Sequence, residues 1–447
     1  MSTVTVEVYR VNPSSAPASA PAATCRYLAL IPHPSRPQVV LQFRDDLWYL
    51  PQWDDAEPRS WQSVEHINRA VQEHFGLAAT TLRCFAREAE MGALGIARVY
   101  EMENRNAAWT PRGRDRWVGR EMLATLPLGI PEQREILERW FAEAEPEQMA
   151  RRRPWMRRGW LDATTNWIRN QFRQRGITFE RVEQVRISEQ ACLLRVFTDA
   201  GTYYFRAVVA MPPYEAALTA TLATWLPGRF PQIVAHDEVH HWLLMDDFGG
   251  AALEGERDIA RWQRAARRFS EIQIGLALRK EELLALGCPE HALPALAAQL
   301  ADLLAGEHAT PPKALAGLSD EQRAALRALL PELQSACIAL QQIDLPATLE
   351  HGDLAASNII QRDDDFAFID WSSSAVAHPF FSLLALLDAA RDTFPAIPDA
   401  PQQIRDAYLS TWALYRPLED LRAAFEMAQA LGPFHFAIAH QRPIALR

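Results

Sequence analysis

The chain has 447 residues, of which 49% are apolar and 23% are charged. This composition excludes a disordered or collagen-like chain, and the length predicts about three domains of roughly 150 residues each. The net charge of −10 excludes a global basic field that would attract nucleic acid or an anionic membrane. No apolar run reaches the roughly 18–20 residues needed to cross a bilayer.

The cysteine content bears on the cellular compartment of the protein, and the lysine content bears on which basic residues could have a functional role. The five cysteines are widely scattered and contain no C-x-x-C pair, which favours buried thiols in a reducing cytoplasm over a disulfide framework or a zinc site. Residues 1–11 carry no secretion signal, so we expect a cytoplasmic protein. Only two of the 46 basic side chains are lysines, Lys280 and Lys313. Any role that usually needs a lysine earlier in the chain would fall to an arginine.

The first elements predict a domain over 24–147. Residues 1–23 are expected to be a flexible tail, because their second half is rich in proline, alanine and serine. One helix is expected at 61–75, where apolar residues recur every three or four positions up to Gly76, and another near 131–145. Strands are expected in the following segments: 27–31, 39–43, 80–88 and 95–103.

Two further regions follow. The arginines at 151–153 and 157–158 indicate a basic, solvated linker over 148–164. A strand-rich lobe is expected at 165–248, and after Gly249-Gly250 a helical lobe at 249–447. Within the first lobe the pattern predicts helices from about 165 and at 213–226, and strands near the following positions: 181–187, 191–198, 202–209, 232–236 and 241–246.

The catalytic candidates lie where the helical pattern of the last lobe is interrupted. Two short apolar strands flank the polar turn at 362–365 and pair as a hairpin, which brings Asp370 back beside Asn358. Asp353 lies on a tight loop that Gly352 permits, because glycine lacks a side chain. A carboxylate and an amide oxygen are ligands that Mg²⁺ prefers, and a second carboxylate can accept a proton from a hydroxyl. The pattern therefore predicts phosphoryl transfer.

The sequence His351-Gly352-Asp353 with Asn358, followed by Ile369-Asp370-Trp371, resembles the signature of the aminoglycoside phosphotransferase and choline kinase-like family. The resemblance covers about 165–447 and implies an α+β, protein-kinase-like two-lobed fold. It implies that Asp353 is the catalytic base and that Asn358 and Asp370 hold Mg²⁺ while ATP phosphorylates a small-molecule hydroxyl. The alternative is that these side chains merely cap turns.

The same resemblance assigns the nucleotide lobe. Arg206 occupies the place of the lysine that holds the ATP phosphates, and Glu215 the place of its ion-pair partner. Arginine keeps the charge and forks onto phosphate, but it is bulkier and planar, so the exchange is not conservative at a tight site. The adenine-binding hinge is expected at three consecutive residues: Met245, Asp246 and Asp247.

Two other positions depart from the family pattern. The phosphate loop at 187–192 contains no glycine, and its Glu189 adds negative charge near the expected phosphates. Ser382 replaces the aspartate that usually starts a helix, although serine can also cap one. Arg206, together with the degenerate N-terminal unit described next, leaves open a second hypothesis, a catalytically weak nucleotide-binding or regulatory pseudokinase.

The segment 24–147 resembles a Nudix α/β/α domain in its element order. Its first helix keeps Arg69 and Glu73 of the pattern Arg-Glu-x-x-Glu-Glu-x-Gly, but Ala70 and His74 replace two of the three carboxylates that hold metals. One carboxylate is a poor Mg²⁺ cage. The resemblance therefore implies a vestigial, non-catalytic domain that senses a ligand or packs against its neighbours, with Nudix hydrolysis as a minor alternative.

The acceptor site is expected among the helices after residue 250. The acidic balance favours a cationic or neutral polyhydroxy small molecule. Trp371 is expected in the core, and His435 and His440 at surface or capping positions. The identity of the acceptor, the choice between ATP and GTP, and the oligomeric state stay open.

Overall fold

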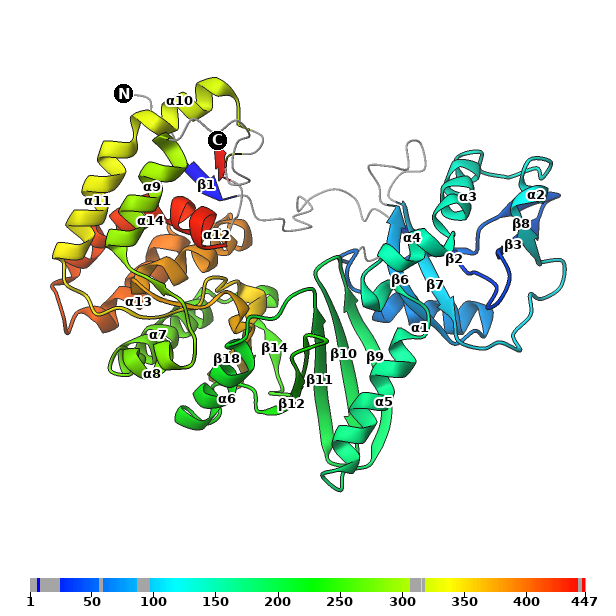
Figure 1. The fold of residues 1–447 in the computed structure, drawn as a ribbon, viewed down its shortest axis with the longest axis horizontal. Helices are drawn as coiled ribbons and strands as arrows, with labels where there is room; N and C mark the ends of the chain where they lie inside the picture. The colour runs from blue at the N-terminus through cyan, green and yellow to red at the C-terminus, as the bar shows by residue number, and fades with distance from the viewer. Residues whose placement is uncertain are drawn as a thin grey trace. The chain divides into compact units, whose positions relative to one another are not determined.

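The computed structural model (Figure 1) describes residues 6–8, 25–55, 59–86, 97–305, 315, 318–440 and 444–446. The chain divides into two compact units. One unit comprises Pro13–Met211 and Ile233–Asp247, and the other comprises Met1–Asn12, Pro212–Gln232 and Phe248–Arg447. Both units contain helices and strands. Within the described residues, no helix is long and apolar enough to cross a membrane.

The first part of one unit is built on two small sheets. One has the strand order β5-β2-β7-β6, with β2 and β7 parallel, and the other has the order β4-β3-β8. The elements expected at 27–31, 39–43, 61–75 and 131–145 are confirmed within a few residues. They and their neighbours are β2 (Cys25–Leu30), β3 (Gln38–Arg44), β4 (Leu47–Tyr49), β5 (Gln52–Asp55), α1 (Glu65–Phe75), β6 (Ala79–Ala86), β7 (Ala97–Asn104), β8 (Arg116–Gly119), α2 (Arg120–Leu123) and α3 (Glu132–Glu143).

The second part of this unit is a five-stranded antiparallel sheet of order β12-β13-β11-β10-β9. Alternate residues of β10 are buried, and they pack with α5, which lies beside the sheet in Figure 1. This alternation is what a strand with one covered face requires. The elements are α5 (Trp160–Arg173), β9 (Phe179–Ile187), β10 (Ala191–Thr198), β11 (Gly201–Val208), β12 (Ile233–Asp237) and β13 (Trp242–Asp246).

These two parts share one core and a hydrogen-bonded junction along β9. The side chain of Gln184 accepts from the Thr81 N–H at 3.1 Å and donates to the Thr81 carbonyl at 2.9 Å. The N–H of Val64 donates to Val185 at 3.0 Å, and a single apolar cluster contains residues from α1, α5, β10 and β11. The outer strand β9 is thereby covered, which protects an edge that could otherwise pair with another chain.

The segment 148–164, expected to be a solvated linker, is folded and partly buried. It contains the end of α4 (Pro146–Arg151), a 3₁₀ turn η3 (Pro154–Met156) and the first turn of α5. Trp155 and Met156 are buried, and Arg152 forms a buried ion pair with Glu101 at 2.9 Å. The expectation was wrong because arginines in sequence can serve as buried partners of a carboxylate, which charge counting alone does not reveal.

The other unit is mainly helical, with short sheets inserted. Its elements are α6 (Glu215–Trp225), β14 (Ala251–Ala252), η4 (Leu253–Gly255), α7 (Ile259–Ala277), α8 (Lys280–Ala285), β15 (Glu290–His291), α9 (Leu293–Ala305), α10 (Asp320–Ala328), α11 (Leu330–Gln342), β16 (Thr348–Glu350), η6 (Ala356–Asn358), β17 (Ile359–Arg362), β18 (Asp365–Phe368), η7 (Trp371–Ser373), β19 (Ala375–Ala377), η8 (Pro379–Leu383), α12 (Leu384–Thr393), α13 (Ala400–Trp412) and α14 (Leu418–His440). Strand β1 (Val6–Val8) pairs with β20 (Ile444–Leu446), while the rest of the expected tail at 1–23 lies outside the described residues.

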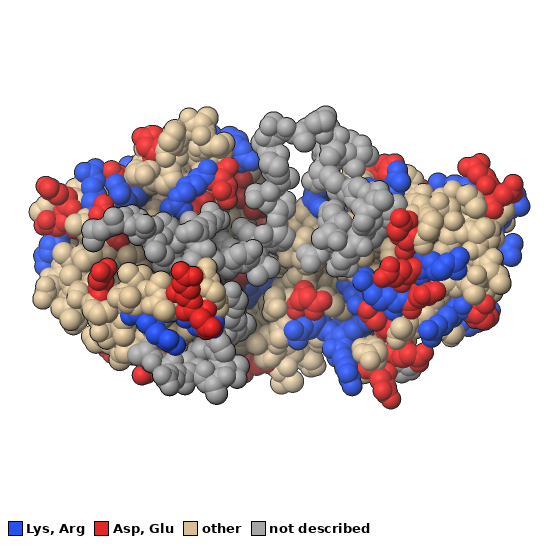
Figure 2. Space-filling view, turned by 90° about the horizontal axis from the view of Figure 1, so that it is seen from above, with Lys and Arg blue, Asp and Glu red and all other residues tan. Residues whose placement is uncertain are grey.

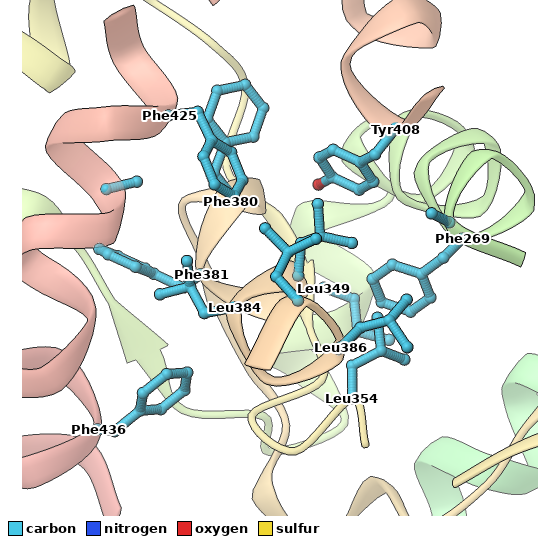
Figure 3. Packing of buried hydrophobic residues seen from close by; sticks show 14 of the residues in the cluster. Phe269, Leu349, Leu354, Phe380, Phe381, Leu384, Leu386, Tyr408, Phe425 and Phe436 are labelled. Atoms are coloured by element: carbon cyan, nitrogen blue, oxygen red, sulfur yellow. The ribbon is translucent and has the colours of Figure 1, made fainter. Parts of the chain in front are cut away.

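The core of this unit lies next to the predicted catalytic loop. Figure 3 shows Phe269 of α7 close to Leu349 and Leu354, which flank that loop, and Phe380 packed near Phe425 of α14. Burial of this aromatic and aliphatic side-chain set is the main stabilising contribution to the unit. The loop therefore rests on a rigid base.

The surface charges and the burial of the cysteines agree with what the sequence predicts. Figure 2 shows acidic and basic side chains interspersed over the face in view. All five cysteines are free thiols, and all except the half-buried Cys84 are buried. Trp371 lies in the core, as expected, whereas His435 is buried rather than exposed. The side chain of His440 lies outside the described set.

Candidate active site

The loop that follows β16 turns sharply at Gly352. Its φ of 71° lies in the left-handed region, and a Cβ placed there would lie 2.0 Å from the Ser373 carbonyl oxygen. Only glycine fits such a position without displacing the backbone. The N–H of Gly352 donates to Oε1 of Glu350 at 3.0 Å. The catalytic loop is thus packed directly against η7.

His351 connects this loop to the hairpin. Its Nδ1 accepts from the Asp353 N–H at 3.3 Å, so Nε2 carries the proton and donates to the Ile369 carbonyl at 3.0 Å. Burial lowers the pKa of His351 and outweighs the opposing influence of the carboxylates Asp353 and Asp370. The ring is therefore a neutral brace between the two chain segments, as its hydrogen bonds require.

The hairpin forms as predicted. Strands β17 and β18 are antiparallel with Ile359 opposite Phe368, and the Ile369 N–H donates to the Asn358 carbonyl at 3.0 Å. The Asn358 amide Nδ2 donates to the Asp353 main-chain oxygen at 2.9 Å. Asn358 is therefore hydrogen-bonded both to Asp353 and to the residue next to Asp370, and Oδ1 of its amide takes no part in either bond.

Asp370 has an unusual backbone for a non-glycine residue. Its φ of 65° lies in the left-handed region, and its Oδ1 accepts from the Ser372 hydroxyl at 2.7 Å. Such strained positions persist only where the surrounding structure holds them, and they gather at functional sites. Both Asp353 and Asp370 are half-buried, which leaves part of each carboxylate accessible.

A buried polar network behind the loop was not predicted from the sequence. Ser382 Oγ accepts from the His351 N–H at 3.0 Å and from Gln273 Nε2 at 3.2 Å. Gln273 also donates to the Leu349 carbonyl at 3.0 Å and accepts from the Tyr408 hydroxyl at 2.5 Å. Ser382 therefore braces the catalytic loop from inside η8, whereas a helix-capping role was expected. Gln273 and Tyr408 left no signal, because they lie on distant helices.

The nucleotide-lobe candidates fall in both units. Arg206 lies half-buried in the middle of β11, paired with Leu193 of β10 and Leu243 of β13. Glu215 is the first residue of α6 and is buried; a carboxylate at that end of a helix is favoured by the helix dipole. The two residues belong to different compact units, and their ion pair stays a prediction.

The expected hinge ends the strand-rich lobe. Met245 and Asp246 close β13, where Tyr204 and Tyr203 pair with them, and the Asp247 N–H donates to the Thr202 carbonyl at 3.1 Å. Asp247 is exposed and is the last residue of its unit. The adenine-binding role of these three residues stays a prediction.

The glycine-free phosphate loop is a tight turn between β9 and β10. The N–H groups of Gln190 and Ala191 donate to Ser188 Oγ at 3.2 and 3.0 Å, and the Ser188 N–H donates to the Ala191 carbonyl at 2.8 Å. Trp155 Nε1 donates to the Ser188 carbonyl at 2.8 Å. The hydroxyl oxygen of Ser188 thus accepts hydrogen bonds from two backbone N–H groups. In a glycine-rich loop, such N–H groups would be available to bind phosphate.

The residues of the expected vestigial Nudix helix lie on α1. Arg69 forms an ion pair with Glu65 at 2.8 Å, and Glu73 is exposed. His74 stacks on Trp53 with ring centroids 6.0 Å apart and lines a cavity of about 130 Å³ that also contains Arg112 and Asp115. Stacking is an ordinary role for an imidazole. Glu73 is therefore the one carboxylate of the expected metal-binding pattern that α1 carries.

Comparison with known proteins shows similarity to one protein family over most of the strand-rich lobe and most of the helical lobe. The model of the phosphotransferase enzyme family matches residues 185–418, which is just over half of the chain. The matched range includes β10 to β13, the catalytic loop and the hairpin. A comparison with curated proteins finds no match.

Three solved structures resemble the chain at low identity. An aminoglycoside phosphotransferase from Streptomyces rimosus is 22% identical, with a TM-score of 0.39, over 62% of this chain and 98% of that one. Plasmodium vivax ethanolamine kinase is 16% identical, with a TM-score of 0.41, over 59% of this chain and 76% of that one. The GDP complex of an aminoglycoside 2′-phosphotransferase is 16% identical, with a TM-score of 0.40, over 62% and 98%.

Proposed function

The chain belongs to the phosphotransferase enzyme family, and from this premise we propose that it transfers the γ-phosphoryl group of ATP to a hydroxyl of a small molecule. The observation that supports the proposal is the pair of hydrogen bonds that joins Asn358 to Asp353 and to Ile369, the residue before Asp370. A carboxylate, an amide oxygen and a second carboxylate are the parts that phosphoryl transfer uses most. Turn-capping alone does not explain the brace at His351, which ties the loop to the Ile369 carbonyl.

Asp353 is the proposed base. It would orient the acceptor hydroxyl and accept its proton as the oxygen bonds to phosphorus. The loop holds Asp353 through its own N–H, which donates to His351 Nδ1 at 3.3 Å. Because His351 is tied to Ile369 and Ser382, the carboxylate approaches its target from a fixed backbone, which reduces the entropy lost on reaching the reactive geometry.

The donor set at 358 and 370 fits a magnesium ion. Asn358 presents an amide oxygen because its nitrogen is used by the Asp353 carbonyl, and Asp370 presents a carboxylate. Both are hard oxygen ligands of the kind Mg²⁺ takes. When bound, Mg²⁺ would neutralise phosphate charge. The Ser372 hydroxyl would keep the Asp370 carboxylate oriented through its hydrogen bond at 2.7 Å.

Incubation with Mg-ATP and a panel of hydroxyl-bearing metabolites tests this function. Cationic and neutral polyols come first, and the readouts are ADP release and the mass gain of a phosphate on the acceptor. Acceptor-dependent turnover supports the proposal. ATP binding without turnover on any acceptor favours the pseudokinase hypothesis, for which the tight Ser188 turn and Arg206 are the supporting observations.

Arg206 is proposed to hold the α- and β-phosphates of ATP beside Glu215. Arg206→Ala should weaken ATP binding by roughly 10–100-fold, since a hydrogen bond to a charged group contributes about 1.5–3 kcal/mol. Arg206→Lys keeps the charge but loses the forked contact to phosphate, so its loss of affinity should be smaller than that of Arg206→Ala. Isothermal titration with a non-hydrolysable ATP analogue measures both. Arg195→Ala, a neighbouring arginine on β10, is the control; equal losses in the two alanine variants would contradict the assignment.

The N-terminal part is proposed to be a Nudix-like domain without hydrolase activity. Its support is the single exposed carboxylate of Glu73 on α1 and the shared junction along β9. We propose that it stabilises the strand-rich lobe. The free thiols of all five cysteines support a reducing, cytoplasmic setting.

A further inference from the structure

A second group of ligand-type side chains lies behind the catalytic loop. One nitrogen each of His291 and His435 and one oxygen of Glu350 lie within 4.8 Å of one another. Among the described residues, this is the one group of three or more histidine, cysteine, aspartate or glutamate side chains with such spacing. None of the three has a part in the proposed transfer of phosphate.

Three separate elements bring these side chains together. Strand β19 lies between β15 and β16, with Ala377 opposite His291 and Ala375 opposite Glu350. Residues two apart on a strand face the same side, so His291 and Glu350 share one face of this small sheet. The residues opposite them on β19 are alanines, which carry short side chains, and His435 comes from α14 to complete the group.

Two members, joined by a hydrogen bond, already lie at the spacing of metal ligands. His435 Nε2 lies 3.2 Å from Glu350 Oε2, and the His435 ring stacks on Phe381 with centroids 4.2 Å apart and planes at 9°. Ligands of a tetrahedral Zn²⁺ with bonds of about 2.0–2.1 Å lie roughly 3.4 Å apart. The His435–Glu350 distance therefore meets the requirement, and His291 needs to approach by an ångström or so.

The surroundings supply what a metal site needs beyond its ligands. The second oxygen of Glu350 accepts from the Gly352 N–H at 3.0 Å, which is the outer contact that orients a ligating carboxylate. A cavity of about 130 Å³ adjoins both histidines and is otherwise lined by residues such as Leu296 and Gln299. This volume holds several waters, so an ion could enter and keep an open coordination position.

We propose that His291, Glu350 and His435 bind a divalent transition-metal ion of the Zn²⁺ type behind the catalytic loop. Two imidazoles with one carboxylate form a set that suits zinc and related ions, whereas Mg²⁺ prefers oxygen ligands alone. Because Glu350 directly precedes the His351-Gly352-Asp353 loop, the ion would fix the strand that leads into it.

Metal titration of the full chain tests the proposal. The protein, with any affinity tag removed, is stripped with a chelator, titrated with Zn²⁺ against a chromogenic chelator and analysed by elemental mass spectrometry. One Zn²⁺ per chain is expected, and Co²⁺ should give the intense visible bands of a tetrahedral site. Absence of a stoichiometric ion in the wild-type protein would overturn the proposal.

Variants distinguish this site from adventitious binding. His291→Ala and Glu350→Gln should each weaken Zn²⁺ binding by about 100-fold or more, since even outer contacts of metal sites contribute 10–100-fold. His378→Asn is the matched control, because His378 is a buried histidine of the same unit outside the group, and asparagine can still accept from the Phe380 N–H. Circular dichroism confirms folding of each variant; undiminished binding in folded His291→Ala would refute the assignment.

Discussion

Asp353→Asn is expected to lower the turnover number of phosphoryl transfer by about 10²–10⁴-fold, which is the contribution of a positioned general base. Asparagine keeps the size of the side chain but cannot accept the hydroxyl proton. The Michaelis constant for ATP should change little, because Asp353 is proposed to act on the acceptor. Steady-state ADP release with a saturating acceptor measures both constants.

The matched control for this variant is Asp363→Asn. Asp363 is exposed in the hairpin turn between β17 and β18 with a φ of 54°, a conformation that asparagine tolerates well. Asp363→Asn removes the same charge close to the hairpin without changing the loop, so the turnover number of this variant should match that of the wild type. Equal activities in Asp353→Asn and Asp363→Asn would rule out Asp353 as the base.

Gly352→Ala is expected to lower the free energy of unfolding by about 2–5 kcal/mol and to abolish activity. A left-handed backbone costs a non-glycine residue about 1–2 kcal/mol, and forcing extra volume into a packed place adds about 1–3 kcal/mol. Here the new Cβ would lie 2.0 Å from the Ser373 carbonyl oxygen, so the loop or η7 must move. Urea denaturation followed by tryptophan fluorescence measures the loss.

Gly287→Ala separates backbone strain from the steric overlap. Gly287 lies in the same unit with a φ of 91°, and a Cβ there would meet Tyr214 at 3.5 Å, an ordinary contact. This variant should lose only about 1–2 kcal/mol and keep its activity. If the two variants proved equally stable, the close packing between the catalytic loop and η7 would not hold in solution.

The segment that is proposed to be catalytic was predictable because its information is local. His351-Gly352-Asp353, Asn358 and Asp370 lie within 20 residues of one another, and two short apolar strands around a polar turn specify their own pairing. The family expected from these residues is confirmed over 185–418. The left-handed φ of Gly352 likewise confirms the tight backbone turn that was expected at this glycine.

Contacts between distant segments escaped prediction. The linker at 148–164 was predicted to be solvated, yet Arg152 pairs with buried Glu101. Burial alone would raise the pKa of Glu101, but the charges of Arg83 and Arg152 outweigh burial, so the pKa lies below its usual value. His435 was expected near the surface and instead contacts Glu350, 85 positions earlier. A single charged or aromatic residue carries no local sign of the partner that it meets after folding.

The sequence by itself determined many of the strands and helices before residue 249, the hairpin and the family, and it predicted the cluster at 353, 358 and 370. These features depend on side-chain periodicity and on turns of a few residues, which act before the chain is compact. Only the tertiary structure decided that β9 is covered by the N-terminal part, that Ser382 and Gln273 brace the catalytic loop, and that two histidines meet Glu350. Those contacts join residues tens of positions apart, and they form because buried polar groups must find partners wherever packing places them.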